Sequence, residues 1–370
     1  MWLKRVPSSD EQGTARAEVD ALLAHAVERG ASDLHLEPMA QGYELRHRID
    51  GVLSTIRALS TEEGGSLVNR LMVAAQLLTY RRGVPQEGRL TVELDGMEAA
   101  RDKLDLRLSV MPTTCGLRAV LRLPAELIQP RSIEALGLPD AVLAGLERFI
   151  GCESGMLILC GPAGSGKTTT TYALLEAIAQ RCPGQSILSL EDPVERELAG
   201  VTQVEVQPFG ELTFEKVLRS MLRQDPQVLA IGEVRDAETA KIAVGAALTG
   251  HRLATTLHAS APQRALVRLV EMGVEPYQVA SAVAGVVSLR LLRRLSQTGD
   301  GYAGRVPVAE YLAVDGAVRE ALLGRADADT LRAAASSQPG WSTMRDHAAR
   351  LVAEGVTDLT EVERVLGRGA

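Results

Sequence analysis

A glycine-rich octapeptide constrains this chain more than any other feature. Residues 161–168 read Gly-Pro-Ala-Gly-Ser-Gly-Lys-Thr, which satisfies the pattern G-x-x-x-x-G-K-[ST]. In this pattern the glycines let the backbone curl so that its N–H groups point inward at an anion. The lysine reaches the β- and γ-phosphates of a nucleotide, and the threonine offers its hydroxyl to Mg²⁺. A chain with this loop has to place it between a buried strand and the start of a helix.

The residues on both sides of the loop have the required patterns. The apolar run Met156–Cys160 is typical of a buried strand, and residues 169–179 are first polar and then helix-forming. The N-terminus of such a helix favours negative charge. The predicted nucleotide-binding residues are Gly161, Pro162, Ala163, Gly164, Ser165, Gly166, Lys167, Thr168 and Thr169.

Length and charge narrow the class of protein. The chain has 370 residues, enough for two or three domains. Its formal net charge is −7 and its pI is about 5.6. Domains that bind nucleic acid without sequence preference usually present a strongly basic face. We therefore expect no direct nucleic-acid contact as the main role.

Cysteine spacing and hydropathy argue against a zinc site, a signal peptide and a membrane-spanning segment. No two of the four cysteines lie two or three residues apart, so the sequence contains no zinc-type pair, and reduced thiols in a cytosolic protein are expected. Residues 1–20 lack the apolar core of a signal peptide. Residues 276–289 form an uncharged stretch, but it is too short and too polar to span a bilayer. Membrane association is therefore expected to be indirect.

Changes of pattern along the chain predict five segments. Helical spacing over residues 15–29 and 66–79, with alternating strands over 34–36, 43–49, 52–59, 89–94, 105–110 and 118–123, indicates a first α+β domain. Strands over 155–160, 186–190, 228–231 and 252–256 alternate with helices, which is typical of a mostly parallel α/β sheet. The predicted segments are a flexible N-terminus (1–14), the first domain (15–123), a proline-containing linker (124–140), the α/β domain (141–312) and a helical C-terminal region (313–370).

Acidic residues and a histidine follow three of the predicted strands. Glu191 ends the apolar run that starts at Ile187, and Glu233 follows the run Val228–Ile231. Ligands bind at the carboxyl ends of strands in open parallel sheets. A carboxylate there can hold Mg²⁺ or orient the attacking water. His258 follows the next strand and is predicted to sense the γ-phosphate, while Thr168 and Glu233 are predicted to lie near Mg²⁺ through the nucleotide and water.

The order of these motifs resembles the secretion and pilus-assembly ATPases, the group of the type II secretion E component and the type IV pilus motors. The resemblance covers roughly residues 30–312, and Glu87 stands where the family usually has Asp. The matching segments are Ala31–Pro38, Arg46–Gly51, Pro85–Arg89, Walker A (Gly161–Thr168), the aspartate box (Ile187–Glu195), Walker B (Leu222–Asp236) and the histidine box (Thr249–Ala259).

The resemblance implies a cytoplasmic ATPase at the inner membrane. It implies a homo-hexameric ring of RecA-like domains, each joined to a PAS-like N-terminal domain, that uses ATP and Mg²⁺ to assemble pilin or pseudopilin fibres. The implied partners are an inner-membrane platform protein and associated cytoplasmic assembly components. By position, Glu191 matches the acid that activates water, Glu233 the Walker B glutamate and His258 the histidine facing the γ-phosphate.

Arg107 and Arg122 match N-terminal-domain arginines that reach nucleotide across the ring. An arginine fork suits that role because it stabilises the charge that develops on the transferred phosphoryl group. The alternative, that both are ordinary charges on a strand surface, stays open.

Two departures from the family and several alternatives remain. No cysteine follows the histidine box where secretion-type members carry a zinc-binding tetracysteine insert, so no zinc is expected. The extra N-terminal docking domain of many relatives is also not expected. The residues 257–280 look closer to the secretion and pilus-extension branch than to the retraction branch. The alternatives are a retraction motor, a DNA-handling or conjugation-type ATPase, and a subunit that joins a mixed ring without hydrolysing ATP.

Overall fold

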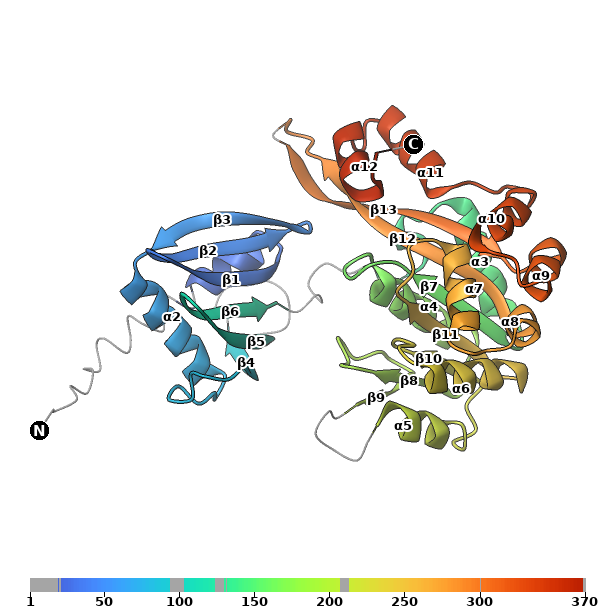
Figure 1. Cartoon of the computed structure of the whole chain (residues 1–370), viewed down its shortest axis with the longest axis horizontal. Helices are drawn as coiled ribbons and strands as arrows, with labels where there is room; N and C mark the ends of the chain where they lie inside the picture. Colours follow the sequence, from blue (N-terminus) through green and yellow to red (C-terminus); the bar gives the residue numbers. More distant parts are fainter. Residues whose placement is uncertain are drawn as a thin grey trace, which may run out of the picture. The chain divides into compact units, whose positions relative to one another are not determined.

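The computed structural model describes residues 19, 21–93, 103–123, 130, 132–206, 213–299 and 301–368. The predicted flexible N-terminus, residues 1–14, lies outside the described residues. The chain divides into two compact units, Met1–Ile128 and Gln129–Ala370 (Figure 1).

A six-stranded antiparallel sheet forms the first unit, with strand order β3-β2-β1-β6-β5-β4. The apolar residues that alternate along its strands face one side, where helix α2 and the helical residues 21–28 cover them. The elements with printed bounds are β1 (Ala31–Met39), β2 (Gly42–Ile49), β3 (Val52–Leu59), α2 (Thr61–Ala74), β4 (Gln86–Glu93), β5 (Lys103–Thr113) and β6 (Gly116–Arg122).

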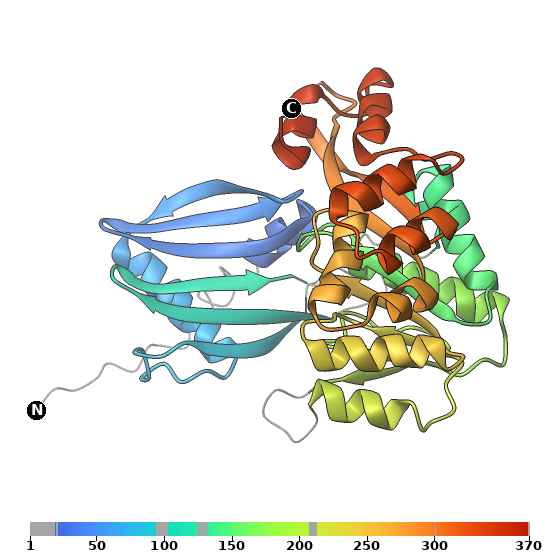
Figure 2. The same cartoon turned by 45° about the vertical axis from the view of Figure 1, so that its right-hand side comes forward.

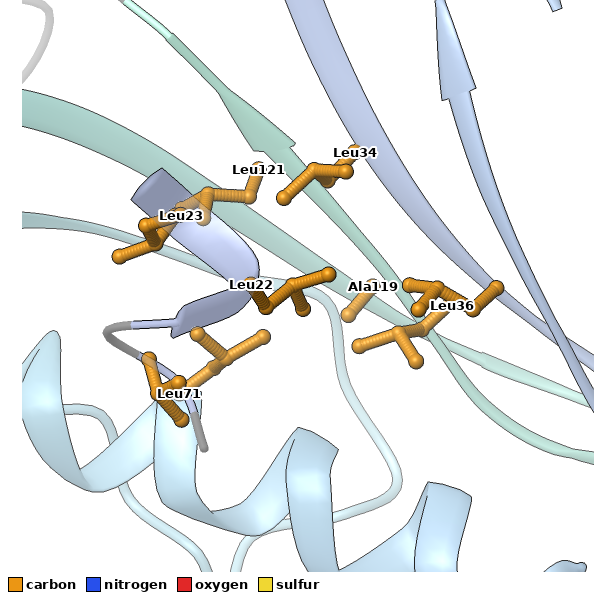
Figure 3. Close-up of a pocket in the computed structure, with 9 residues that line it drawn as sticks. Leu22, Leu23, Leu34, Leu36, Leu71, Ala119 and Leu121 are labelled. Carbon is orange, nitrogen blue, oxygen red and sulfur yellow. The ribbon is translucent and has the colours of Figure 1, made fainter. Parts of the chain in front are cut away.

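A small cavity lies inside this apolar core (Figure 3). Leu22 and Leu23 of the helical residues 21–28 pack over Leu34 of β1 and Leu71 of α2. The lining side chains are all apolar. The cavity is therefore a gap in the packing and offers no group that would bind a polar ligand.

Helix α2 begins and ends about one turn earlier than the predicted span of 66–79. Ser60 caps it: its Oγ accepts a hydrogen bond from the Glu63 N–H (3.2 Å), and its own N–H donates to the Glu63 carboxylate (2.8 Å). This capping box offsets the low helix propensity of the two glycines that follow. Gly64 is required because a Cβ there would lie 2.3 Å from the ring of Tyr43.

The second unit is built on a seven-stranded sheet with the order β13-β12-β7-β11-β10-β8-β9. All neighbouring strands are parallel except β13, which runs antiparallel to β12. The strands are β7 (Gly155–Cys160), β8 (Ile187–Glu191), β9 (Thr202–Glu205), β10 (Val228–Ile231), β11 (Arg252–Leu257), β12 (Val283–Leu295) and β13 (Tyr302–Ala313). Consecutive parallel strands need crossover helices, which explains the alternation seen in the sequence.

Helices cover both faces of this sheet (Figure 2). Helices α3 and α4 pack on one face, and α5 to α10 supply the core on the other. The short helix η2 (Glu134–Leu136) precedes α3 (Asp140–Gly151). The others are α4 (Lys167–Arg181), α5 (Phe214–Met221), α6 (Ala237–Leu248), α7 (Pro262–Glu271), α8 (Pro276–Ala282), α9 (Gly316–Leu323), α10 (Ala328–Ser336), α11 (Met344–Ala353) and α12 (Leu359–Leu366).

The sequence prediction of four strands in this unit omits β9 and the long hairpin β12–β13. The apolar stretch 276–289 divides into helix α8 and the first half of β12. Ile133, Leu136 and Leu138, within the predicted linker 124–140, are buried in the core of the second unit. None of the helices in the described parts of the chain is long and apolar enough to cross a membrane.

Candidate active site

The glycine-rich loop connects the end of β7 to the first residue of α4. Gly166 caps this helix in a left-handed conformation (φ 95°). Gly161 has φ 153°, and a Cβ there would lie 2.5 Å from the Ser165 Oγ and 2.6 Å from the Leu289 carbonyl oxygen. Contacts this short leave room for glycine alone at the loop entrance.

Lys167 is held across the loop. Its Nζ donates hydrogen bonds to the carbonyl oxygens of Gly161 (2.8 Å) and Pro162 (2.9 Å). Burial lowers the pKa of Lys167, and the negative charge of Glu233 acts in the opposite direction. The ammonium group is therefore in place at the mouth of the loop, within electrostatic reach of Glu233.

Parallel pairing brings the ends of four strands to one edge. Leu257, the last residue of β11, pairs with Cys160 at the end of β7. Strand β10 pairs with β11 on one side and with β8 on the other. The loop, His258, Glu233 and Glu191 follow or end these strands in that order across the sheet, as the sequence predicts for a ligand-binding edge.

Glu233 is the centre of a charged cluster at this edge. Its side chain is 19% exposed, and its Oε1 lies 3.0 Å from His258 Nε2. Its Oε2 accepts a hydrogen bond from Arg235 Nε (2.7 Å). Arg235 also donates through Nη1 to Asp192 Oδ2 (3.4 Å), which follows β8. Both oxygens of Glu233 thus have cationic or imidazole neighbours, and the ends of β8 and β10 are joined by one guanidinium.

Glu191 occupies a different environment. It is 6% exposed, and its Oε1 accepts hydrogen bonds from Ser189 Oγ (2.5 Å) and Gln203 Nε2 (3.1 Å). Its Oε2 accepts a hydrogen bond from the hydroxyl of Tyr172 on α4. Burial and this carboxylate raise the pKa of Tyr172. Three donors hold the carboxylate of Glu191. Activation of water by Glu191 stays a prediction.

The residues predicted to lie near Mg²⁺ have suitable chemistry. The Thr168 side chain is exposed in the first turn of α4, and Glu233 lies at the same edge of the sheet. Hydroxyl and carboxylate oxygens are the hard ligands that Mg²⁺ prefers. Among the described residues, no group of three or more His, Cys, Asp or Glu side chains is placed to hold a metal ion. The prediction of no zinc stays a prediction.

Arg107 and Arg122 lie in the first unit, opposite each other on β5 and β6. Arg122 Nε donates to Asp33 Oδ1 (3.2 Å), and Arg48 approaches the other oxygen of Asp33 (3.5 Å). The side chain of Arg122 is still 69% exposed. Their action across a subunit boundary stays a prediction.

Sequence reasoning missed several members of the site. Arg235 and Asp192 could have been found from the sequence, because each stands within two residues of a predicted acid in the motifs Glu191-Asp192 and Glu233-Val234-Arg235. Tyr172 and Gln203 were not, because only the packing of α4 and β9 against β8 brings them to Glu191.

Comparison with known sequences gives one family and several relatives. Residues 8–364 match the family described as "Type II/IV secretion system protein". The type II secretion system protein HxcR of Pseudomonas aeruginosa is 38% identical, with 94% of this chain and 76% of that protein covered. The type IV pilus assembly ATPase PilB of Thermus thermophilus is 34% identical, with 97% of this chain and 44% of that protein covered. The alignment with PilB therefore spans less than half of that protein.

Two solved structures share the architecture. The pilus retraction motor PilT with bound ADP is 26% identical, with a TM-score of 0.66 over 94% of this chain and 96% of that one. The ATPase DotB of Legionella pneumophila is 24% identical, with a TM-score of 0.74 over 94% and 95% of the two chains. The likeness to DotB bears on the fold alone.

Proposed function

The chain belongs to the type II/IV secretion system protein family, and we propose that it is an ATP-hydrolysing homo-hexameric motor that powers the assembly of pilin or pseudopilin fibres. The predicted fold class is confirmed: a RecA-like P-loop core, an α+β PAS-like N-terminal domain and a helical C-terminal region. The observation that carries the proposal is the placement of Lys167, Glu233 and His258 at one edge of the parallel sheet.

The proposed reaction uses the geometry of that edge. The loop N–H groups and Lys167 bind the phosphates, since both present donors at the N-terminus of α4. Glu233 orients a water molecule whose oxygen attacks the γ-phosphorus as the bond to the β-phosphate oxygen breaks. The products are ADP and phosphate, and Glu233 takes up the proton of the water. His258 and Arg235 each lie against one oxygen of Glu233 and orient its carboxylate, which keeps further lone pairs that can accept a hydrogen bond from the water.

Residues around the reacting groups have proposed supporting roles. Thr168 and Glu233 would hold Mg²⁺ through the nucleotide and water. When bound, this ion neutralises charge on the phosphate oxygens. His258 senses the γ-phosphate, and Arg107 and Arg122 of a neighbouring subunit stabilise charge on the transferred group. Glu191 fixes the end of β8 through its three hydrogen bonds and shares in water activation.

The proposed setting follows from the family. We place the motor in the cytoplasm, at the inner membrane, through contact with a polytopic platform protein and associated cytoplasmic assembly components. PilB of Thermus thermophilus, one of the relatives, is described as a type IV pilus assembly ATPase, which supports the assembly role.

Phosphate release by the purified full chain tests the enzymatic part. Lys167→Ala is expected to abolish release without unfolding the protein, because the loop loses its cation. Glu233→Gln is expected to bind ATP but to stop turnover, because an amide cannot accept the proton. Lys216→Ala, which removes an exposed lysine on α5, is the matched control and is expected to behave as wild type. A wild-type protein that is inactive in every oligomeric state, also with the platform protein present, would refute the proposal.

A further inference from the structure

Strand β12 continues past the end of β7 and lines one side of the phosphate loop. Ser288 of β12 pairs with Cys160, the last residue of β7, so Arg290 lies beside the first residues of the loop. A Cβ at Gly161 would lie 3.2 Å from Arg290 Nη1. The next residue, Leu291, has its Cδ2 3.8 Å from a Cβ position at Gly166. The side chain of Arg290 therefore belongs to the wall of the nucleotide site.

Arg290 is a partly buried cation that forms no ion pair with any of the residues that the structure describes. Its Nη1 donates to the carbonyl oxygen of Leu289 (2.8 Å) and its Nη2 to that of Ser260 (3.0 Å). Within the described parts of the chain, no carboxylate pairs with it. Burial lowers the pKa of Arg290, and Cys160 acts in the opposite direction. Charges withdrawn from water are normally paired with an opposite charge, so this guanidinium lacks an anion.

A second cation lies close by. Lys167 Nζ donates to the carbonyl oxygen of Gly161 (2.8 Å), and a Cβ on the same Gly161 would lie 3.2 Å from Arg290 Nη1, so two positive groups flank the first residue of the loop. Arginine has five N–H donors in a planar fork, and the two carbonyl contacts use only part of them. Two cations that repel each other at the mouth of an anion-binding loop are stabilised together when a polyanion binds.

We propose that Arg290 binds the phosphates of the nucleotide held by the loop of its own subunit, as a second cation beside Lys167. The inference rests on the proposed function, since it assumes that the loop holds a nucleotide. Arg290 then differs from Arg107 and Arg122, because it comes from the same unit as the loop and does not depend on assembly of a ring.

A purely structural role for Arg290 predicts a different result for the Arg290→Lys variant. In that role Arg290 would only tie the loop at Ser260 to β12 through two carbonyl oxygens. Arg290→Lys keeps the charge but cannot reproduce the fork that spans both carbonyls. If Arg290 binds phosphate, Arg290→Lys therefore recovers nucleotide affinity. If Arg290 is only a structural bridge, the lysine variant does not recover it.

The experiment is titration of the full chain with ADP and with ATP by calorimetry, at two salt concentrations. Arg290→Gln is expected to weaken both affinities by on the order of 10- to 100-fold, as for a lost hydrogen bond between charged groups. It should also reduce the salt dependence of ADP binding. Arg290→Lys should recover most of the affinity. Arg294→Gln, an exposed arginine on the same strand, is the matched control and should bind as wild type.

Two outcomes would overturn the inference. One is wild-type affinity of Arg290→Gln for both nucleotides, and the other is an equal loss in the lysine and glutamine variants. Thermal unfolding without nucleotide is measured alongside, and a variant that does not fold is replaced by Arg290→Met, which keeps the aliphatic stem. Failure of the wild-type chain to bind any nucleotide would instead refute the proposed function.

Discussion

Glu361→Gln tests what holds the C-terminal helices on the sheet. The Glu361 side chain is fully buried (0% exposed) near the start of α12. Its carboxylate accepts hydrogen bonds from the Arg293 backbone N–H (2.9 Å), Nε (2.9 Å) and Nη2 (2.7 Å), and from Arg364 Nε (2.7 Å). Arg293 also lies 3.8 Å from the ring centre of Tyr302. The cluster joins α12 to the β12–β13 hairpin.

The pKa of Glu361 gives the magnitude. Burial alone would raise this pKa, but hydrogen bonds from Arg364 and Arg293 outweigh it and lower the pKa from 4.5 to about 2. One pKa unit corresponds to about 1.4 kcal/mol, so the ionised carboxylate favours the folded state by about 3 kcal/mol at neutral pH. Because the folded-state pKa is the lower one, this contribution is complete above pH 4.5 and is lost as the pH falls through about 2.

The assay is urea unfolding of the full chain, followed by the fluorescence of Trp341. The chain has two tryptophans, and a Trp2→Phe background leaves Trp341, which is partly buried between α10 and α11. At pH 7 we expect Glu361→Gln to lower the free energy of unfolding by about 3 kcal/mol, with roughly half of this difference remaining at pH 3.

Glu363→Gln on the same helix provides the control. Glu363 is 40% exposed and pairs at 3.4 Å with Arg368, which is 90% exposed. A surface pair of this kind contributes at most about 1 kcal/mol, so the control should unfold nearly as wild type. The reasoning would be refuted by a loss below about 1 kcal/mol in Glu361→Gln at pH 7, or by a difference that does not shrink on acidification.

Three further changes test the site. Gly161→Ala should weaken ADP binding by at least about tenfold in calorimetry, because the added Cβ would lie 2.6 Å from a backbone carbonyl; wild-type affinity would contradict the close packing. Tyr172→Phe should lower the free energy of unfolding by about 1–3 kcal/mol, because it removes a donor to the buried Glu191; unchanged urea denaturation would contradict that bond. Arg235→Gln should lower kcat for ATP by about tenfold with little change in KM, since Arg235 orients Glu233; a change in KM alone would show a binding role instead.

Much of the second unit was predictable because its parallel strands are short and buried on both faces. The runs at β7 and β10 are almost wholly apolar, those at β8 and β11 mix apolar with buried polar residues, and a motif follows each run or includes its end. Since parallel strands present their carboxyl ends at one edge, the order of the motifs was enough to bring the loop, Glu233 and His258 together. The family assignment and the fold class were predictable for the same reason.

The rest depended on pairings that no local pattern contains. Strand β12 starts in an apolar run and ends among arginines, so neither strict alternation nor a buried-strand pattern covers its length. The burial of Glu191 required β9 to pair with β8, which places Gln203 opposite Ser189. Helix α2 was shifted because the two glycines after its capping box look like a helix end in the sequence.

Strand β12, which was not predicted from the sequence, contributes both to the phosphate loop and to the cluster around Glu361. Its first half pairs with β7 up to Ser288, which fixes Arg290 beside the phosphate loop. Its pairing with β13 extends from Gly285 to Leu295 and includes Arg293, which enters the cluster around Glu361. The two arginines are three residues apart on one strand, and the same hydrogen-bonded pairing with β13 positions the backbone of both. The wall of the nucleotide site and the anchor of the C-terminal helices are therefore parts of the same strand.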